Sequence, residues 1–156
     1  MIALLCLILL GCASVSLAWI DFRQGIIPDW LNLGIALLGM VRAVSLGGWP
    51  FVAEAIAEAV VVGAVIWLLR WIYFRLRNTQ GLGLGDVKLL AASTLWIGIA
   101  GVPVQLLVAA FTALATALAL HVAGTKMTRH TALPFGPFLA FGLMVAILLQ
   151  QSGALD

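Results

Sequence analysis

Residues 2–20 read IALLCLILLGCASVSLAWI, an apolar run without a charged side chain, and Asp21 follows it directly. A helix needs about 20 such residues to cross the hydrocarbon of a bilayer. Hydrophobic residues make up 64% of the 156-residue chain and charged residues only 9%, too few to cover a water-soluble surface. The composition predicts an integral membrane protein. The net charge of +2 gives no reason to expect nucleic acid as a partner.

Further apolar runs follow along the chain and are separated by short connections. We expect about six transmembrane helices in one all-α bundle, forming a single domain over residues 1–156. Their expected bounds are residues 2–20, 30–46, 51–71, 87–99, 102–122 and 135–149. The fourth run is too short to span a bilayer alone, so we expect it to extend into the glycine-rich segment before it.

Lysine and arginine residues predict the orientation of these helices, because they gather in cytoplasmic connections. Seven of the eight follow the first, third and fifth helices: Arg23, Arg70, Arg75, Arg77, Lys88, Lys126 and Arg129. The even-numbered connections hold only Arg42. This distribution predicts a multi-pass protein of the cell (cytoplasmic) membrane with both termini outside the cytoplasm. Asp21 and Asp86 would then lie at the cytoplasmic side.

The two cysteines predict neither a lipid anchor nor a metal site. The sequence LLGCAS around Cys12 resembles a lipoprotein signal, but the basic residues that begin such a signal are missing. Cys6 and Cys12 belong to one expected helix and cannot reach each other to form a disulfide bond. The sequence has no CxxC pair of the kind that binds zinc. We therefore expect no metal and no cofactor.

Aspartates at the ends of apolar runs are the first candidates for chemistry, because a carboxylate beside hydrocarbon is costly and commonly functional. Asp21 is expected to end the first helix, before a connection in which Gly25 and Pro28 prevent a continuous helix. The alternative for Asp21 is a solvated charge paired with Arg23. For Asp29, a cap of the next helix is favoured over a direct catalytic role.

The segment GLGLGDVKLL carries the second candidate, Asp86. Gly81, Gly83 and Gly85 alternate with leucine, which predicts an extended backbone open to close approach by another chain. A phosphate cradle is disfavoured, because Asp86 would repel phosphate and the P-loop lysine is missing. A capping role for Asp86 alone would not explain the alternating glycines. Gly39, inside the second helix, is expected to tolerate alanine unless packing is tight there.

The stretch LPFGPFLAFG, residues 133–142, is the third candidate element. Pro134, Gly136 and Pro137 predict an irregular entry into the last helix. Irregular backbone at membrane depth survives where it is buried in protein or lines a wet cavity. An ordinary helix start is the alternative.

Four other ionisable residues have plainer interpretations. Glu54 and Glu58 lie four apart on one face of the third helix and are expected to face the bundle or the outer interface, with a transport role as the alternative. His121 ends the fifth helix and His130 lies in a basic connection. Neither histidine has a second ligand at metal spacing, so we expect both to be interfacial.

The three motifs occur in one order: Asp21 with IIPDWL, GLGLGDVKLLAA around Asp86, and LPFGPFLAFG. Together they resemble the type IV prepilin peptidases, membrane aspartyl proteases of the GxGD class. The resemblance implies that Asp21 and Asp86 are the catalytic pair and that Gly83 and Gly85 are the signature glycines. It also implies removal of a short basic leader from prepilin or pseudopilin precursors, next to the start of a hydrophobic helix. The residues expected to bind substrate are Gly83, Gly85, Pro134, Phe135, Gly136 and Pro137.

Larger members of that family also N-methylate the new amino terminus, through a portion with CxxC pairs. This chain has no CxxC and resembles the short, peptidase-only members. Presenilin-like proteases share the GxGD signature but place their first aspartate within a transmembrane helix. Two other functions stay open: a proton-coupled transporter that uses the same carboxylates with Glu54 and Glu58, and a catalytically silent pilus assembly factor.

Overall fold

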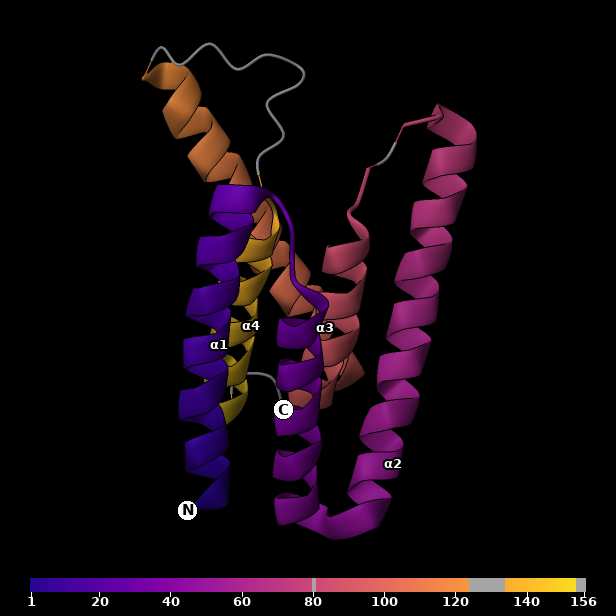
Figure 1. Ribbon diagram of the computed structural model, residues 1–156, viewed down its shortest axis with the longest axis vertical. Coiled ribbons are helices and arrows are strands. Elements are labelled where there is room, and N and C mark those ends of the chain that lie inside the picture. Colours follow the sequence, from indigo (N-terminus) through magenta and orange to yellow (C-terminus); the bar gives the residue numbers. More distant parts are fainter. Residues whose placement is uncertain (80, 124–133, 154–156) are drawn as a thin grey trace.

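The computed structural model describes residues 1–79, 81–123 and 134–153. Its elements are α1 (Ile2–Gln24), α2 (Asp29–Arg77), α3 (Leu84–Val122) and α4 (Gly136–Gln151), and the described residues contain no strand (Figure 1). The first three helices are long and apolar enough to cross a membrane, whereas α4 is shorter. The all-α class is therefore confirmed and the apolar helices fit a membrane bundle. The number of six crossings remains a prediction.

Two glycines bend the long helices. Gly48 in α2 has a φ of 70° and Gly98 in α3 a φ of 66°, left-handed values that glycine adopts without strain. At each glycine the chain turns back on itself, so α2 and α3 each have two arms (Figure 1). The four arms are residues 29–47, 49–77, 84–97 and 99–122.

Side chains from other segments satisfy the backbone groups that the bend at Gly98 frees from helical hydrogen bonding. Three hydrogen bonds do this: Arg42 to the Trp96 carbonyl (3.1 Å), Gln150 to the Ile97 carbonyl (2.6 Å), and the Ile99 amide to the Glu58 carboxylate (2.9 Å). Irregular backbone inside a membrane protein needs such partners, because lipid offers none.

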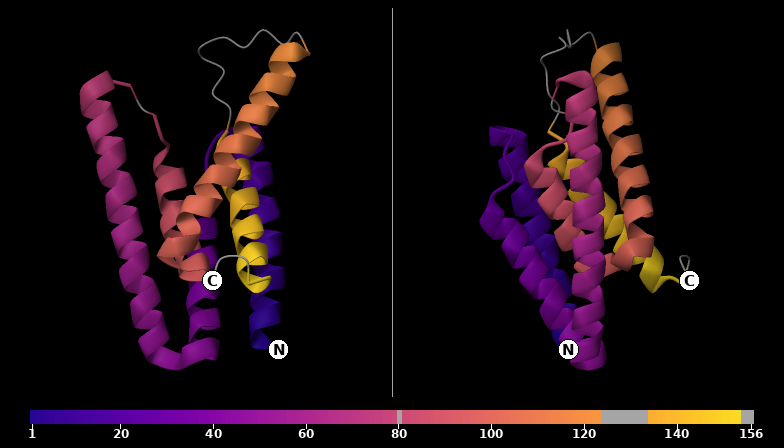
Figure 2. Two further views of the ribbon diagram at one scale, coloured as in Figure 1. Left: turned by 180° about the vertical axis from the view of Figure 1, so that it is seen from behind. Right: turned by 90° about the vertical axis from the view of Figure 1, so that its right-hand side faces the viewer.

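The core lies around the first arm of α3, which packs against α2 and α4. Leu89 of this arm is fully buried, as are Leu17 of α1, Ile35 of α2 and Leu139 of α4. Figure 2 shows α4 beside α1, in agreement with their contacts. The outer surface is largely apolar, as a surface that faces lipid requires.

The connection between α1 and α2 is shorter than expected, because α1 continues to Gln24. Gly25, with a φ of 65°, ends the helix and donates its N–H to the Asp21 carbonyl at 2.8 Å. Asp21 therefore lies in the last turn of α1. Helix α2 begins at Asp29 after Pro28 in the N-cap position, without a side-chain cap. The expected capping role of Asp29 is therefore wrong.

Candidate active site

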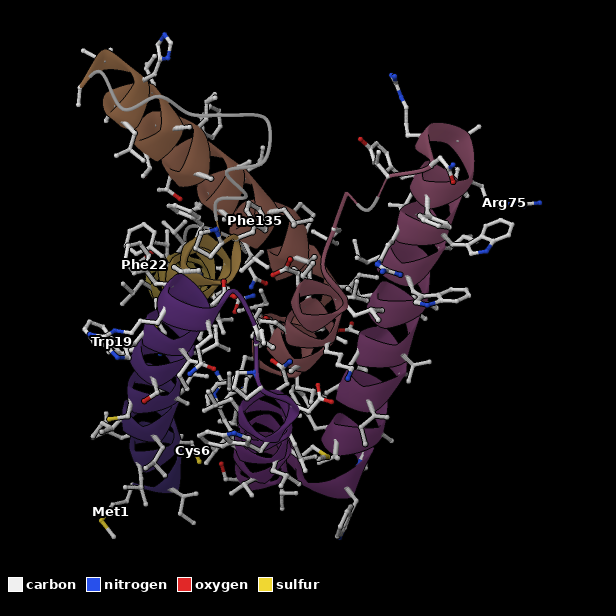
Figure 3. The ribbon with its side chains drawn as sticks, turned by 45° about the horizontal axis from the view of Figure 1, so that its top comes forward. Met1, Cys6, Trp19, Phe22, Arg75 and Phe135 are labelled. Atoms are coloured by element: carbon white, nitrogen blue, oxygen red, sulfur yellow. The ribbon has the colours of Figure 1, made fainter. Side chains whose placement is uncertain are left out.

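The Asp21 side chain points into the protein from the last turn of α1. It is only 5% exposed, and its Oδ2 atom accepts a 2.9 Å hydrogen bond from the Gly136 amide at the start of α4. Its neighbours Trp19 and Phe22 are exposed and point away from the bundle (Figure 3). Arg23 stacks over the Trp19 ring, 4.8 Å from its centroid. Asp21 is thus not a solvated charge paired with Arg23.

The Asp86 side chain lies at the start of α3, in the first turn. It is 9% exposed, and its Oδ2 atom accepts a 3.3 Å hydrogen bond from the Gly83 amide. Gly83 is the N-cap residue, so Asp86 does cap this helix. The positive end of the helix dipole also favours a carboxylate there. The capping role and a role in the site apply to the same side chain.

Both carboxyl groups line one cavity of about 330 Å³. They are close enough for the charge of Asp21 to act on Asp86. The cavity is bounded by the α1–α2 connection on one side and by the start of α3 on the other. Two buried carboxyls facing one cavity can share a proton, because both cannot ionise cheaply.

The glycines of this region make room for their neighbours inside the protein. A Cβ atom on Gly85 would lie 2.9 Å from the Ile27 Cβ, and one on Gly83 would lie 3.0 Å from Asp86 Oδ2. The space beside Gly85 is therefore occupied by the α1–α2 connection. Gly83 and Gly85 line the cavity, and their contact with substrate remains a prediction.

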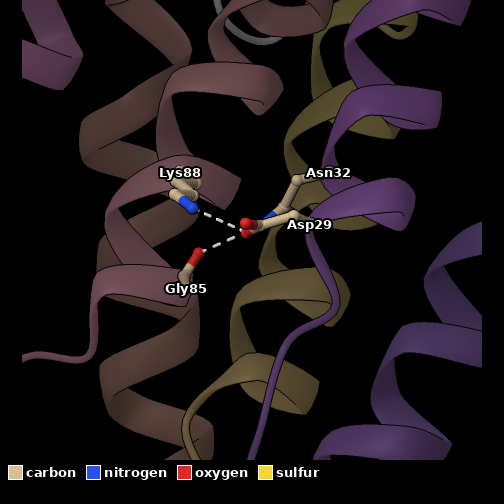
Figure 4. Close-up of polar contacts among 4 residues, drawn as sticks. All are labelled: Asp29, Asn32, Gly85 and Lys88. Carbon is tan, nitrogen blue, oxygen red and sulfur yellow. Dashed lines mark hydrogen bonds and ion pairs between the residues drawn. The ribbon is translucent and has the colours of Figure 1, made fainter.

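An ion pair closes one side of the cavity. Lys88 Nζ lies 2.7 Å from Asp29 Oδ1, and both residues line the cavity (Figure 4). Asn32 Nδ2, one turn into α2, lies 3.5 Å from the Gly85 carbonyl oxygen. In the sequence, Lys88 is a signal for topology only, and Asn32 carries no local signal of a role in the site. Only the packing of α2 against α3 brings them to the site.

Gly136, in the last motif, contacts a catalytic candidate through its hydrogen bond to Asp21. A Cβ atom on Gly136 would lie 2.6 Å from Asp21 Oδ2, so only glycine lets the two come this close. Pro137 occupies the first turn of α4, where proline is well tolerated. The described part of the motif begins α4 and its Gly136 also contacts Asp21, so a helix start and a role in the site apply to the same segment. Pro134 and Phe135 do not line the cavity, and Leu133 lies outside the described residues.

The remaining ionisable candidates lie apart from the two aspartates. Glu54 and Glu58 line a different cavity together with Arg42. This cavity shares no lining residue with the cavity of Asp21 and Asp86. His121 is exposed near the end of α3. Lys126, Arg129 and His130 lie outside the described residues, so the expectations for them stay predictions. Within the described ranges, no group of three or more His, Cys, Asp or Glu side chains lies close enough together to hold a metal ion.

A helical membrane bundle with two buried carboxyls at one cavity defines a polytopic membrane protein with a site suited to acid/base chemistry. The model of the type IV leader peptidase family matches residues 6–118, a range that contains both aspartates. The chain belongs to this family.

Relatives from several bacteria are similar over most of the chain. A prepilin leader peptidase/N-methyltransferase of Burkholderia pseudomallei (strain 1026b) is 36% identical over 135 residues, which cover 83% of this chain and 41% of the relative. A prepilin leader peptidase/N-methyltransferase of Escherichia coli (strain K12) is 34% identical over 139 residues, which cover 89% of this chain and 60% of the relative. The chain spans about half the length of these curated relatives. No solved structure matches it.

Proposed function

We propose that this protein is a membrane aspartic endopeptidase that removes the short basic leader from type IV prepilin-like or pseudopilin-like precursors. The observation that carries the proposal is the shared cavity of Asp21 and Asp86, two buried carboxyls from separate helices. Membership of the leader peptidase family supports the same reaction class.

The reaction needs the two carboxyls in different protonation states. The ionised one takes a proton from a water molecule as the water oxygen attacks the scissile carbonyl carbon. The protonated one donates its proton to the developing oxyanion. The first carboxyl then passes the proton that it took from water to the leaving amine as the C–N bond breaks, and the hydroxyl formed at the former oxyanion returns its proton to the second carboxylate as the carbonyl re-forms. The amides of Gly136 and Gly83 each bind one carboxyl oxygen and thereby fix the orientation of the pair.

We place the site at the cytoplasmic face. Arg75 and Arg77 occupy the last turn of α2, which points to the same end of the bundle as the last turn of α1 (Figure 1). Arg70 donates a 2.8 Å hydrogen bond to the Leu82 carbonyl, which ties the segment before Asp86 to this basic end of α2. Cytoplasmic enrichment of basic residues supports this orientation, with α1, α4 and the four arms as six membrane crossings.

Co-expression with a candidate prepilin precursor tests the proposal, with leader removal scored as a mobility shift. The wild-type protein is expected to convert the precursor, and the Asp86→Asn variant to leave it intact at equal expression. Leader removal that proceeds equally with the Asp86→Asn variant would contradict the proposed mechanism. The proposal covers leader cleavage and leaves N-methylation aside.

A further inference from the structure

An open apolar groove lies between the two arms of α2, over the first arm of α3. Its volume is about 710 Å³, and no described part of the chain fills it. Of the second arm of α2, only Val52 and Val62 are buried. Small residues let helices approach each other closely inside a membrane. The small residues that line the groove are Ala36, Ala59, Gly63, Ala64, Ala91 and Ala92.

One end of this groove meets the candidate active site. Asp29 and Lys88 line both the groove and the cavity that holds Asp21 and Asp86. Their ion pair therefore lies at the boundary between the two hollows. A chain segment lying in the groove would have its end beside the catalytic pair.

Asn32 provides an independent indication that the groove takes an occupant. It lines the groove and is only 6% exposed. Its Nδ2 atom faces the Gly85 carbonyl, but its Oδ1 atom has no hydrogen-bond partner among the described residues. A buried acceptor without a donor costs free energy and requires an explanation. This oxygen is covered by protein, so a donor on a bound segment would supply the missing hydrogen bond once the Asn32 side chain turns toward the groove.

We propose that the groove holds the apolar helix of the precursor and that Asn32 accepts a hydrogen bond from an N–H in the first turn of that helix. This inference rests on the proposed function. The first N–H groups of an α-helix have no partner within the helix, so the start of a precursor helix carries such donors. A lipid acyl chain would fill the apolar part of the groove but offers Asn32 no donor.

Photo-crosslinking tests where the helix lies. The probe is a synthetic precursor, a basic leader followed by an apolar helix of about 20 residues, mixed with the full-length protein carrying Asp86→Asn. A photoreactive phenylalanine replaces Val60, which lines the groove, or Val61, which lines a separate recess near Pro103. An adduct is expected at position 60 and none at position 61. Equal or absent labelling at both positions, with a precursor that the wild type cleaves, would overturn the inference.

Cleavage rates give a second test that allows for folding defects. The rate for the full precursor is divided by the rate for a short peptide that ends soon after the cleaved bond. Val60→Trp is expected to lower this ratio more than about tenfold, because the bulky ring occupies the place of the helix. Asn32→Leu is expected to lower it as well, whereas Val61→Trp leaves it within about twofold. An unchanged ratio in Val60→Trp would overturn the groove assignment.

The two proposals fail in different ways. A wild-type protein that cleaves neither substrate would contradict the proposed function, whatever the crosslinks show. A wild type that cleaves both, combined with an unchanged ratio in Val60→Trp, would contradict the groove alone.

Discussion

The amide of Gly136 donates a hydrogen bond to the Asp21 carboxylate at 2.9 Å, across 115 positions of sequence. This contact fixes the start of α4 against the last turn of α1, and it holds one carboxyl of the pair in place. Gly136 does not itself line the cavity, so it contributes to the site through its contact with Asp21.

Gly136→Ala is expected to lower leader cleavage more than about tenfold, because its methyl group would lie within 2.6 Å of Asp21 Oδ2 and displace the carboxyl. Gly34→Ala is the matched control, since a Cβ atom there would meet nothing within 4 Å. Both variants are compared by mobility shift at equal membrane expression. Equal cleavage by the two would show that the Gly136 contact does not position Asp21.

Asp21→Asn and Asp86→Asn are each expected to lower cleavage at least about 100-fold, because the attack of water needs an ionised and a protonated carboxyl at the same moment. Asparagine keeps an oxygen that can accept the hydrogen bonds from Gly136 and Gly83. The variants should therefore insert and accumulate like the wild type. Quantitative immunoblots of membranes measure this together with leader removal. Near-wild-type cleavage by either variant would refute the assignment of that residue.

Gly85→Val is expected to abolish most cleavage while membrane insertion persists, because its side chain would collide with Ile27 of the α1–α2 connection. Ile27→Gly should partly restore cleavage in the double variant, since it removes the whole Ile27 side chain, including the Cβ atom that lies 2.9 Å from a Cβ at position 85. A double-mutant cycle of cleavage rates measures this coupling. Additive effects would instead favour direct contact between Gly85 and substrate.

Cysteine labelling checks the topology. In a background of Cys6→Ala and Cys12→Ser, Thr79→Cys is expected to react only with a reagent that crosses the membrane. Ser152→Cys is expected to react with an impermeant reagent added to the outside, because basic residues retain the segment near Thr79 in the cytoplasm. Labelling of position 79 from outside intact cells would contradict the proposed orientation. Asp21 and Asp86 would then lie on the opposite side of the membrane from the basic leader.

Glu54→Gln separates a peptidase from a proton-coupled transporter. It is expected to leave cleavage within about twofold, because its cavity shares no residue with that of the aspartates. Glu58→Leu should cost about 1 kcal/mol of stability, since it removes the oxygen that accepts the Ile99 amide at 2.9 Å. Thermal unfolding in detergent and the cleavage assay measure the two effects. A strong loss of cleavage in Glu54→Gln would show that the peptidase reaction also needs this carboxyl, whereas a wild type without any cleavage would favour the transporter.

The sequence predicts the helical class and the places where the chain turns, because hydropathy and glycine are local signals. It does not reveal that α1 continues through Asp21 or that Ile27 fills the space beside Gly85. Those features depend on contacts between segments far apart in the chain. Gly39 shows the same limit: a Cβ atom there would lie 2.9 Å from Leu95 and from Trp96, so the tight packing that the expectation named as its exception is present.

The three hydrogen bonds around Gly98 have a mechanical consequence. They tie both arms of α3 to α2 and α4 at the end of the bundle away from the aspartates. We therefore expect Gly98 to act as a hinge between the two arms of α3. The free ends of the two arms of α3 would then move apart while the hydrogen bonds at the bend stay formed. Amide hydrogen exchange should then be slow around Ile97 and Ile99 and faster at Leu84, and the reverse order would exclude this motion.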